Sequence, residues 1–437
     1  MPNILGLKDW NVTIRQENDH DMAITAEYAA NPTVCLRCGV ESPRLKKYGV
    51  QEQTFMDTPI HGKRVGIKIM RQRYKCLECE KTFQQQLPDM DEKRTMTRRL
   101  LAYIRRRSLE RTFTEVASDV GLDERTIRNI FNDYVDELND SYWPQTPNWL
   151  GIDELFLVRK PRCIFTNVQA NTIIDMLPNR DKVSVAKWLS QRPHKEVIEV
   201  VTMDMWKPYR DAVTANLPGA KVVVDKFHVV KLANHCLDTV RKSLREGMDL
   251  KQRRKLMHDR HLILRRRKNL EPMDFMMMQA WTDSIPALFS AYQAKEDFYD
   301  IWDTATSRAE AMELYDLWKA TLEPKTRSAF YELIRAVDNW RFEVFNYFDF
   351  KGATNAYTES ANGLAKIANR LGRGYSFEAI RAKVLFGQAK HVMKPKFGTG
   401  EWELIGSRTE DAGVSVPDLV TLYFVGHGCE LNTLESE

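Results

Sequence analysis

Residues 149–228 alternate short apolar runs with amphipathic stretches, and this order limits the folds open to the chain. Five of the runs have the length and the β-branched or aromatic content of strands; they are NWLGIDELFLV, RCIFTNVQ, NTIIDML, VIEVVTMD and AKVVVDKFH. DKVSVAKWLSQR precedes the fourth run and WKPYRDAVTANL the fifth, and both have helical spacing, the first with Val183, Ala186 and Leu189 on one face. Three strands, a helix, a strand, a helix and a strand predict a mixed α/β sheet.

Carboxylates accompany three of these strands. Asp153 lies inside the first run, while Asp204 and Asp225 close the fourth and fifth. A single aspartate at a strand end usually caps a helix or pairs with a base, but three of them, with Glu359 on a later helix, favour one shared site. Carboxylates gathered at one sheet edge repel each other unless cations neutralise them. Oxygen ligands select Mg²⁺ or Mn²⁺, and two such ions can support phosphodiester cleavage.

The helix that carries Glu359 also presents groups suited to a phosphate backbone. Asn362 and Lys366 follow at i+3 and i+7, on the same face, and Arg370 comes one turn later. These three residues are therefore candidates for DNA contacts. The alternative is a solvated amphipathic helix without a ligand.

Four of the seven cysteines form two close pairs. Cys35 and Cys38 make one C-x2-C, and Cys76 and Cys79 make the other. Two such pairs can hold one structural zinc ion in a closed tetrahedral site with no open position for catalysis. The alternative is a chance pairing of buried thiols. Basic residues beside the second pair indicate that this module faces phosphates.

The segment TFTEVASDVGLDERTIRNIFNDYV has the pattern of a helix-turn-helix. Thr112 and Thr114 are candidates to cap the first helix, Gly121 is placed to make the turn and Asp123 to cap the second helix. Arg125 and Arg128, near the start of the second helix, would then face a major groove. Such helix pairs also occur in proteins that bind no DNA, but the basic run RRLLAYIRRR just before it favours DNA binding.

The rest of the chain predicts helices and no membrane span. Residues 229–350 show no strand alternation, and their methionines and aromatics, as in MDFMMMQAW, are expected in contacts between helices. No run approaches the length of a transmembrane helix, and the N-terminus lacks the pattern of a signal peptide, so we expect a cytoplasmic, nucleoid-associated protein. A net charge of +5, with the basic residues clustered, favours a polyanionic partner.

Taken together, these motifs resemble the bacterial insertion-sequence transposases of the DDE class, ISL-three type. The resemblance is carried by the two C-x2-C pairs, RYKCLECEKTF, the helix-turn-helix segment, LGIDELF, VVTMDMWKPYRDAV, VVVDKFHVVKLAN and TESANGLAKIANRLGRGYSFEAIRAKVLF. It extends from about residue 35 to 390. The tail lies outside it.

The resemblance implies an α/β plus α fold: a ribonuclease H-like mixed sheet with a large helical insertion, preceded by a zinc module and a helix-turn-helix domain. The boundaries we predict are a zinc module at 1–92, a helix-turn-helix domain at 93–142, a catalytic core at 148–230 and 351–395, a helical insertion at 231–350 and a tail at 396–437.

The resemblance also implies a site and an activity. Asp153 and Glu359 match the first and last members of the catalytic triad. Asp204 is favoured as the middle member, with Asp225 as the alternative and His228 beside the site. The implied protein is a magnesium-dependent transposase that binds the terminal inverted repeats of double-stranded DNA, as a homodimer or larger assembly, and cuts and transfers strands. The alternatives are an inactive DNA-binding regulator with the same fold and a structure-specific nuclease.

Overall fold

The structure is a computed structural model that describes residues 5–387, 393–395 and 402–404. Contacts between residues divide the chain into two compact units. The first comprises residues 1–143 and 368–389, and the second comprises residues 144–367 and 390–437. The tail expected at 396–437 lies outside the described residues, except for 402–404.

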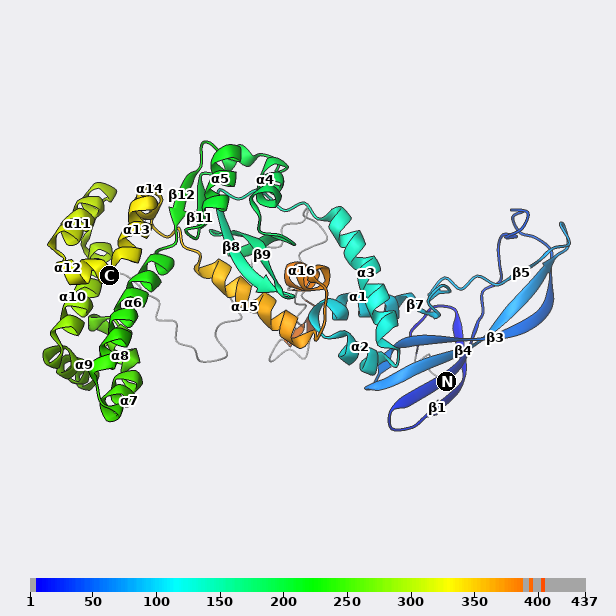
Figure 1. Cartoon of the computed structure of the whole chain (residues 1–437). Coiled ribbons are helices and arrows are strands. Elements are labelled where there is room, and N and C mark those ends of the chain that lie inside the picture. The colour runs from blue at the N-terminus through cyan, green and yellow to red at the C-terminus, as the bar shows by residue number, and fades with distance from the viewer. Residues whose placement is uncertain (1–4, 388–392, 396–401, 405–437) are drawn as a thin grey trace. The chain divides into compact units, whose positions relative to one another are not determined.

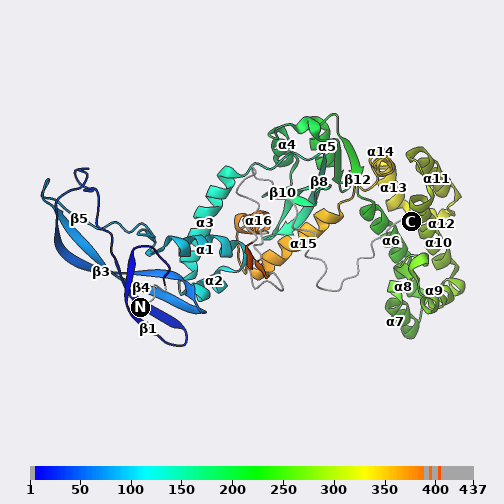
Figure 2. The ribbon, with the colours of Figure 1, turned by 180° about the vertical axis from the view of Figure 1, so that it is seen from behind.

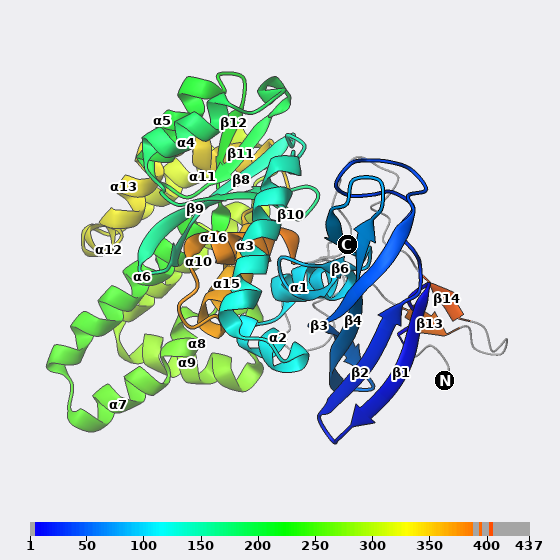
Figure 3. The ribbon, with the colours of Figure 1, turned by 90° about the vertical axis from the view of Figure 1, so that its right-hand side faces the viewer.

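The first unit begins with a seven-stranded sheet (Figure 3). Its strands are β1 (Trp10–Glu17), β2 (Asp21–Tyr28), β3 (Leu45–Ile60), β4 (Lys63–Cys76), β5 (Thr82–Gln84), β6 (Met90–Asp91) and β7 (Met96–Thr97). They follow the order β1-β2-β4-β3-β7-β6, and β5 pairs with β4. Val65, Ile67 and Ile69 alternate along β4 and are fully buried, because successive side chains of a strand point to opposite faces of the sheet.

Three helices follow the sheet: α1 (Arg98–Glu110), α2 (Phe113–Val120) and α3 (Glu124–Ser141). The caps expected from the sequence are present. Thr112 and Glu115 form a capping box at the start of α2, Gly121 ends α2 with φ +72°, and the Asp123 side chain accepts from the backbone of Thr126 at the start of α3. The helix-turn-helix prediction is confirmed at these positions.

A helix from far along the chain completes this unit. Helix α16 (Phe377–Phe386) contacts α1, and Tyr375 just before it accepts a hydrogen bond from the Phe113 backbone N–H at 3.0 Å. The Lys383 ammonium donates to the backbone oxygens of Ser108 and Arg111, around the C-terminal end of α1. It also lies over the rings of Phe113 and Tyr375. Residues about 260 positions apart thus share one core.

The second unit is built on a five-stranded mixed sheet (Figure 2). Its strands are β8 (Trp149–Leu157), β9 (Lys160–Asn167), β10 (Thr172–Leu177), β11 (Val200–Met203) and β12 (Lys221–Val224), in the order β10-β9-β8-β11-β12. β8, β9 and β10 pair antiparallel, whereas β11 runs parallel to both β8 and β12. The mixed sheet and its strand sequence agree with the prediction.

Two helices, α4 (Lys182–Ser190) and α5 (Lys207–Asn216), supply the core that covers one face of this sheet. The predicted face of α4 is wrong at its first position, because Val183 is 76% exposed. Leu189 is buried as predicted, together with Val185 and Trp188, and the Trp188 indole stacks on the Phe165 ring. The stacked pair fixes the rotation of the helix more strongly than one valine.

Helices fill the chain between β12 and residue 350 (green to yellow in Figure 1). The α-helices are α6 (Lys226–Ser243), α7 (Leu250–His258), α8 (Arg260–Leu264), α9 (Pro272–Ser284), α10 (Pro286–Thr304), α11 (Arg308–Thr321), α12 (Pro324–Ala329), α13 (Tyr331–Asn339) and α14 (Arg341–Phe345). Helix α15 (Ala356–Leu371) follows, and Met393–Pro395 pairs with Trp402–Leu404. Within the described part of the chain, no helix has the length and apolar character needed to cross a bilayer.

The substitution Lys383→Met should change how the stability of the first unit depends on pH. Burial lowers the pKa of the Lys383 ammonium to about 7, although the Glu115 carboxylate acts to raise it. In the unfolded chain the lysine pKa is about 10.4. Between about pH 7 and pH 10 the unfolded chain therefore binds more protons than the folded chain, and the free energy of unfolding rises with pH. Between pH 7 and pH 9.5, the free energy of unfolding of the unsubstituted chain should increase by up to about 3 kcal/mol more than that of the variant.

The measurement is a urea titration that follows the ¹⁹F signal of a fluorotyrosine at Tyr103 in α1, at both pH values. The same pH dependence in both proteins would show that the Lys383 ammonium is not desolvated in the folded unit.

Candidate functional site

Neighbouring strands place the aspartates at one end of the five-stranded sheet. β11 ends at Met203 and β12 at Val224, so Asp204 and Asp225 directly follow two parallel strands that pair in register. Asp153 lies within β8, on the other side of β11. Asp153 and Asp225 are buried, at 5% and 3% exposure. The topology therefore gathers three carboxylates from separate parts of the sequence.

The start of α15 is held against the same strands. Gly151 in β8 lies so close to Thr166 and Thr358 that a Cβ atom would be 2.3 Å and 2.7 Å from their hydroxyl oxygens. These two hydroxyls are themselves hydrogen-bonded at 2.7 Å. Glycine is thus needed at position 151 for the close approach, and this contact fixes the helix turn that carries Glu359.

A buried asparagine secures the residues just before α15. Asn355 is fully buried; its Nδ2 donates to the Ile152 backbone oxygen at 3.3 Å, and its Oδ1 accepts from the Thr202 hydroxyl. One side chain thereby bridges β8 and β11. The position of Glu359 relative to the aspartates is set by direct contacts with the sheet rather than by a loop.

His228, in the first turn of α6, lies among the carboxylates. Its Nε2 atom is 2.7 Å from Asp204 Oδ1 and 3.7 Å from Glu359 Oε1. Ligand atoms of Asp225, His228 and Glu359 all lie within 4.8 Å of one another. Asp225 Oδ1 also accepts from the Phe227 backbone N–H and caps α6. The imidazole is therefore the point where the Asp204 and Glu359 side chains meet.

Asn362 binds the remaining aspartate. Its Nδ2 donates to Asp153 Oδ2 at 2.7 Å, and the residue is only 6% exposed. Its Oδ1 is buried, and no donor among the described residues reaches it. The structure thus places Asn362 inside the carboxylate cluster, apart from the exposed Lys366 and Arg370 with which its helical spacing groups it.

The cluster opens into a hollow of about 600 Å³. Asp204 and His228 form part of its wall, together with Arg180, Trp206 and Lys231 among others. The Arg180 guanidinium lies over the Trp206 ring, 4.4 Å from its centroid. Asp204 is therefore accessible from a cavity that also carries cations and an aromatic ring.

Burial and the charges of neighbouring acids raise the pKa values of Asp153, Asp225 and Glu359. The pKa of Asp153 is raised to about 7, first by burial and then by the charges of Asp204 and Glu359. Burial likewise raises the pKa of Asp225 and that of Glu359. Burial acts to lower the pKa of His228, but the Asp204 carboxylate outweighs it and the pKa is raised. The site is therefore stabilised by protonation or by a bound cation.

These groups fit divalent cations of the hard type. The donors are carboxylate oxygens, an amide oxygen that accepts from none of the described residues, and one imidazole. Hard divalent cations prefer oxygen ligands, and a bound cation removes the repulsion that raises the pKa values. The fit rests on the crowding of the acids and on the free Asn362 oxygen.

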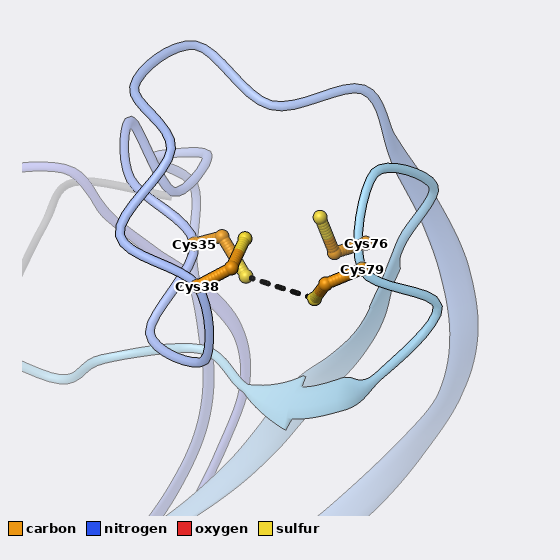
Figure 4. A group of neighbouring side chains, drawn as sticks. All are labelled: Cys35, Cys38, Cys76 and Cys79. Carbon is orange, nitrogen blue, oxygen red and sulfur yellow. Dashed lines mark hydrogen bonds between the residues drawn. The ribbon is translucent and has the colours of Figure 1, made fainter.

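The predicted cysteine cluster forms in the first unit. The sulfur atoms of Cys35, Cys38, Cys76 and Cys79 all lie within 4.8 Å of one another (Figure 4). Cys35 Sγ and Cys79 Sγ are 3.8 Å apart. Zinc–sulfur bonds of about 2.3 Å in a tetrahedron require about 3.8 Å between sulfurs. The four thiols therefore fit one structural zinc ion.

The predicted DNA-reading arginines lie at the start of α3. Arg125 is exposed, while Arg128 is half-buried, pairs with Glu124 and lies 5.3 Å from the Phe113 ring centroid. Arg125 is thus free to reach a ligand without breaking an ion pair to a described residue, whereas Arg128 must first leave Glu124.

Comparison with known proteins agrees with this arrangement. A family model for the DDE transposases of the ISL3 type, described as "Transposase", matches residues 150–384, more than half of the chain. The chain belongs to the ISL3 transposase family. This match includes all the carboxylates of the cluster, and the resemblance read from the motifs is confirmed.

Two further family models match the first unit of this ISL3 transposase. The helix-turn-helix domain of transposase family ISL3 matches residues 85–135, and the zinc-finger of transposase IS204/IS1001/IS1096/IS1165 matches residues 31–79. The transposase for insertion sequence element IS1001 of Bordetella parapertussis is 23% identical over 295 residues, which cover 64% of this chain and 70% of that protein.

Sequence reasoning missed the contacts that orient the acids. Asn362 was grouped with the cations of its helix, because the i+3 spacing from Glu359 does not reveal which side of α15 faces the sheet. No sequence motif pointed to Asn355 or Thr358. The signal that points to them is Gly151, since a glycine inside a strand marks a close approach by another element.

Cys76→Ser should abolish zinc binding. We expect about one zinc ion per unsubstituted chain, because a hydroxyl cannot replace a thiolate in this tetrahedral site. Elemental analysis of the purified proteins measures this directly. Cys236→Ala is the matched control, since Cys236 is a buried thiol of the second unit outside the cluster. Full zinc content in the Cys76 variant would contradict the assignment.

Proposed function

We propose that this ISL3 family member binds the terminal inverted repeats of an insertion sequence and catalyses magnesium-dependent cleavage and strand transfer of DNA. The observation that carries the proposal is the cluster of Asp153, Asp204, Asp225 and Glu359 around one end of the sheet. DNA binding alone does not require a cluster of buried acids that destabilise one another. The zinc cluster and the helix-turn-helix support recognition of a particular DNA sequence.

The second unit is, in this proposal, a ribonuclease H-like core interrupted by a helical insertion. The strand order β10-β9-β8-β11-β12, in which β9 alone runs antiparallel to the other four strands, supports that topology. We propose residues 148–230 and 351–395 as this core and residues 231–350 as the insertion, after a zinc module at 1–92 and a helix-turn-helix domain at 93–142; α16, near the end of the second core segment, packs in the first unit. The insertion then separates Glu359 from the other acids in sequence while α15 returns it to the sheet.

Asp153, Asp204 and Glu359 hold the cations in this mechanism, and Asn362 keeps the Asp153 carboxylate oriented. The cations held by these carboxylates would supply Lewis-acid chemistry for the attacking and the leaving oxygen at phosphorus. Lys366 and Arg370, both exposed on α15, bind the DNA backbone by charge. Arg125 and Arg128 at the start of α3 contact base edges in the major groove.

We assign the middle catalytic position to Asp204. The charge of Asp204 is the largest influence on the Asp153 pKa after burial, which supports their proximity. Asp225 is more deeply buried, and one of its oxygens already caps α6. Asp225 does lie close to Glu359 and His228, so it lines the same cluster.

The substrate implies an assembly and a location. Both ends of a transposon must be held together for strand transfer, so the active form is at least a homodimer. Double-stranded DNA is the partner, which places the working protein at the nucleoid in the cytoplasm.

Asp153→Asn and Glu359→Gln should each remove cleavage and leave binding of the repeat ends unchanged. Each change removes one negative charge from the cation site while preserving side-chain shape, so we expect a loss of at least about 100-fold in cleavage rate, of the order seen when charge stabilisation is removed at other catalytic sites. Gel-shift and nicking assays with selected end DNA and Mg²⁺ measure the two properties.

The control is Asp175→Asn, an acid of the same sheet outside the cluster. Magnesium-dependent cleavage that survives in both variants would contradict the metal assignment. End binding without cleavage by the unsubstituted chain would indicate the inactive regulator instead. Cutting without joining would indicate a nuclease.

Asp204→Asn and Asp225→Asn should separate the two candidates for the middle position. Asparagine can still accept the Phe227 N–H, so the second variant keeps the cap of α6. We expect the first variant to lose cleavage as fully as Asp153→Asn and the second to retain measurable cleavage. Calorimetric titration with Mn²⁺, without DNA, provides a second readout, and the reverse ranking would make Asp225 the ligand.

A further inference from the structure

A groove between helices α7 and α9 has no part in the proposed reaction. It consists of two adjoining hollows of about 440 Å³ and 450 Å³, which share Lys255, Trp281 and Ser284 in their walls. Trp281 lies between them, and its indole N–H donates to the buried Asp259 carboxylate at 2.9 Å. The groove therefore has a fixed aromatic centre.

Methionines form much of one hollow. Met273 is 68% exposed, Met276 65% and Met277 39%. The expectation that these side chains lie between helices is wrong for all three; only Met278 of this run is buried. Exposed apolar side chains gathered around a hollow mark an interaction surface, and methionine adapts its shape to an apolar partner.

The rim of the groove is positively charged. Lys251 and Lys255 line it, and Lys251 forms no ion pair with any described residue. A nucleic acid backbone would satisfy the lysines but would leave the methionines in contact with charge and water. An occupant that suits both features combines apolar side chains with carboxylates.

The chain itself contains a segment of this composition. Residues 409–437 hold six acidic residues and no lysine or arginine. Within them VSVPDLVTLYFV, residues 414–425, is mostly apolar. The segment lies beyond residue 384, where the match to the transposase family model ends. Its character is thus complementary to the groove in both hydrophobicity and charge.

We propose that residues 409–437 bind the groove between α7 and α9 of the same chain. The apolar run packs on the methionines and Trp281, and the carboxylates face Lys251 and Lys255. Covalent attachment gives such a segment an effective concentration in the millimolar range, so weak contacts suffice within one chain. The helical insertion thereby binds a segment from the C-terminal end of the same chain.

The test is photo-crosslinking in the full-length protein. A benzoylphenylalanine at Met276 should crosslink to a peptide from residues 409–437, identified by mass spectrometry. The same label at Leu317, an exposed apolar position of α11, should not. Mixing isotopically heavy and light chains separates the sources, because attachment within one chain gives no heavy–light products.

Charge reversal supplies the second readout. Lys251→Glu with Lys255→Glu should reduce the crosslink from Met276 at least about threefold, and adding Glu410→Lys with Asp411→Lys should restore it. Heavy–light products would show that the segment comes from a second copy and overturn the assignment to the same chain. Crosslinks only to other regions would overturn the proposal altogether. Neither outcome depends on cleavage or on DNA.

Discussion

Repulsion between carboxylates is the constraint on which the second unit depends. Burial raises the pKa values of Asp153, Asp225 and Glu359, and the charges of the neighbouring acids raise these pKa values further, so the acids do not stabilise one another in the folded protein. Other contacts must therefore hold them together. Gly151, Asn355 and the Thr166–Thr358 hydrogen bond do this, by fixing the first turn of α15 on β8 and β11. The free energy of packing a helix on a sheet offsets the cost of crowding the charges.

Helical insertions are compatible with this arrangement because the site needs only the two ends of the insertion. α6 begins at the site, with Asp225 as its cap and His228 in its first turn, and α15 returns to it. The helices between them have their own core of aromatic side chains, such as the cluster of Trp302, Phe345 and Phe348. The insertion can therefore differ in size or carry other surfaces without moving the carboxylates.

Much of the fold could be predicted from the sequence. Strand lengths, the two caps of the helix-turn-helix and the cysteine pairs follow from local rules, and the structure agrees with them. The position of Asn362 could not be predicted, because helical spacing says which residues share a face but not what that face contacts. The predicted burial of Val183 and Met276 was wrong for the same reason. Both sit on apolar patterns, and only the packing of Phe165 on Trp188, or the partners available to α9, decides which side is buried.

Helix α16 has a consequence for the order in which the protein is made. The first unit contains residues 1–143, but it is completed by Tyr375 and Lys383, which leave the ribosome after Asp153, Asp204, Asp225 and Glu359. A nascent or truncated chain thus presents a helix-turn-helix that lacks one of its packing partners. The module that recognises DNA reaches its final form only when the whole set of acidic residues has already been synthesised.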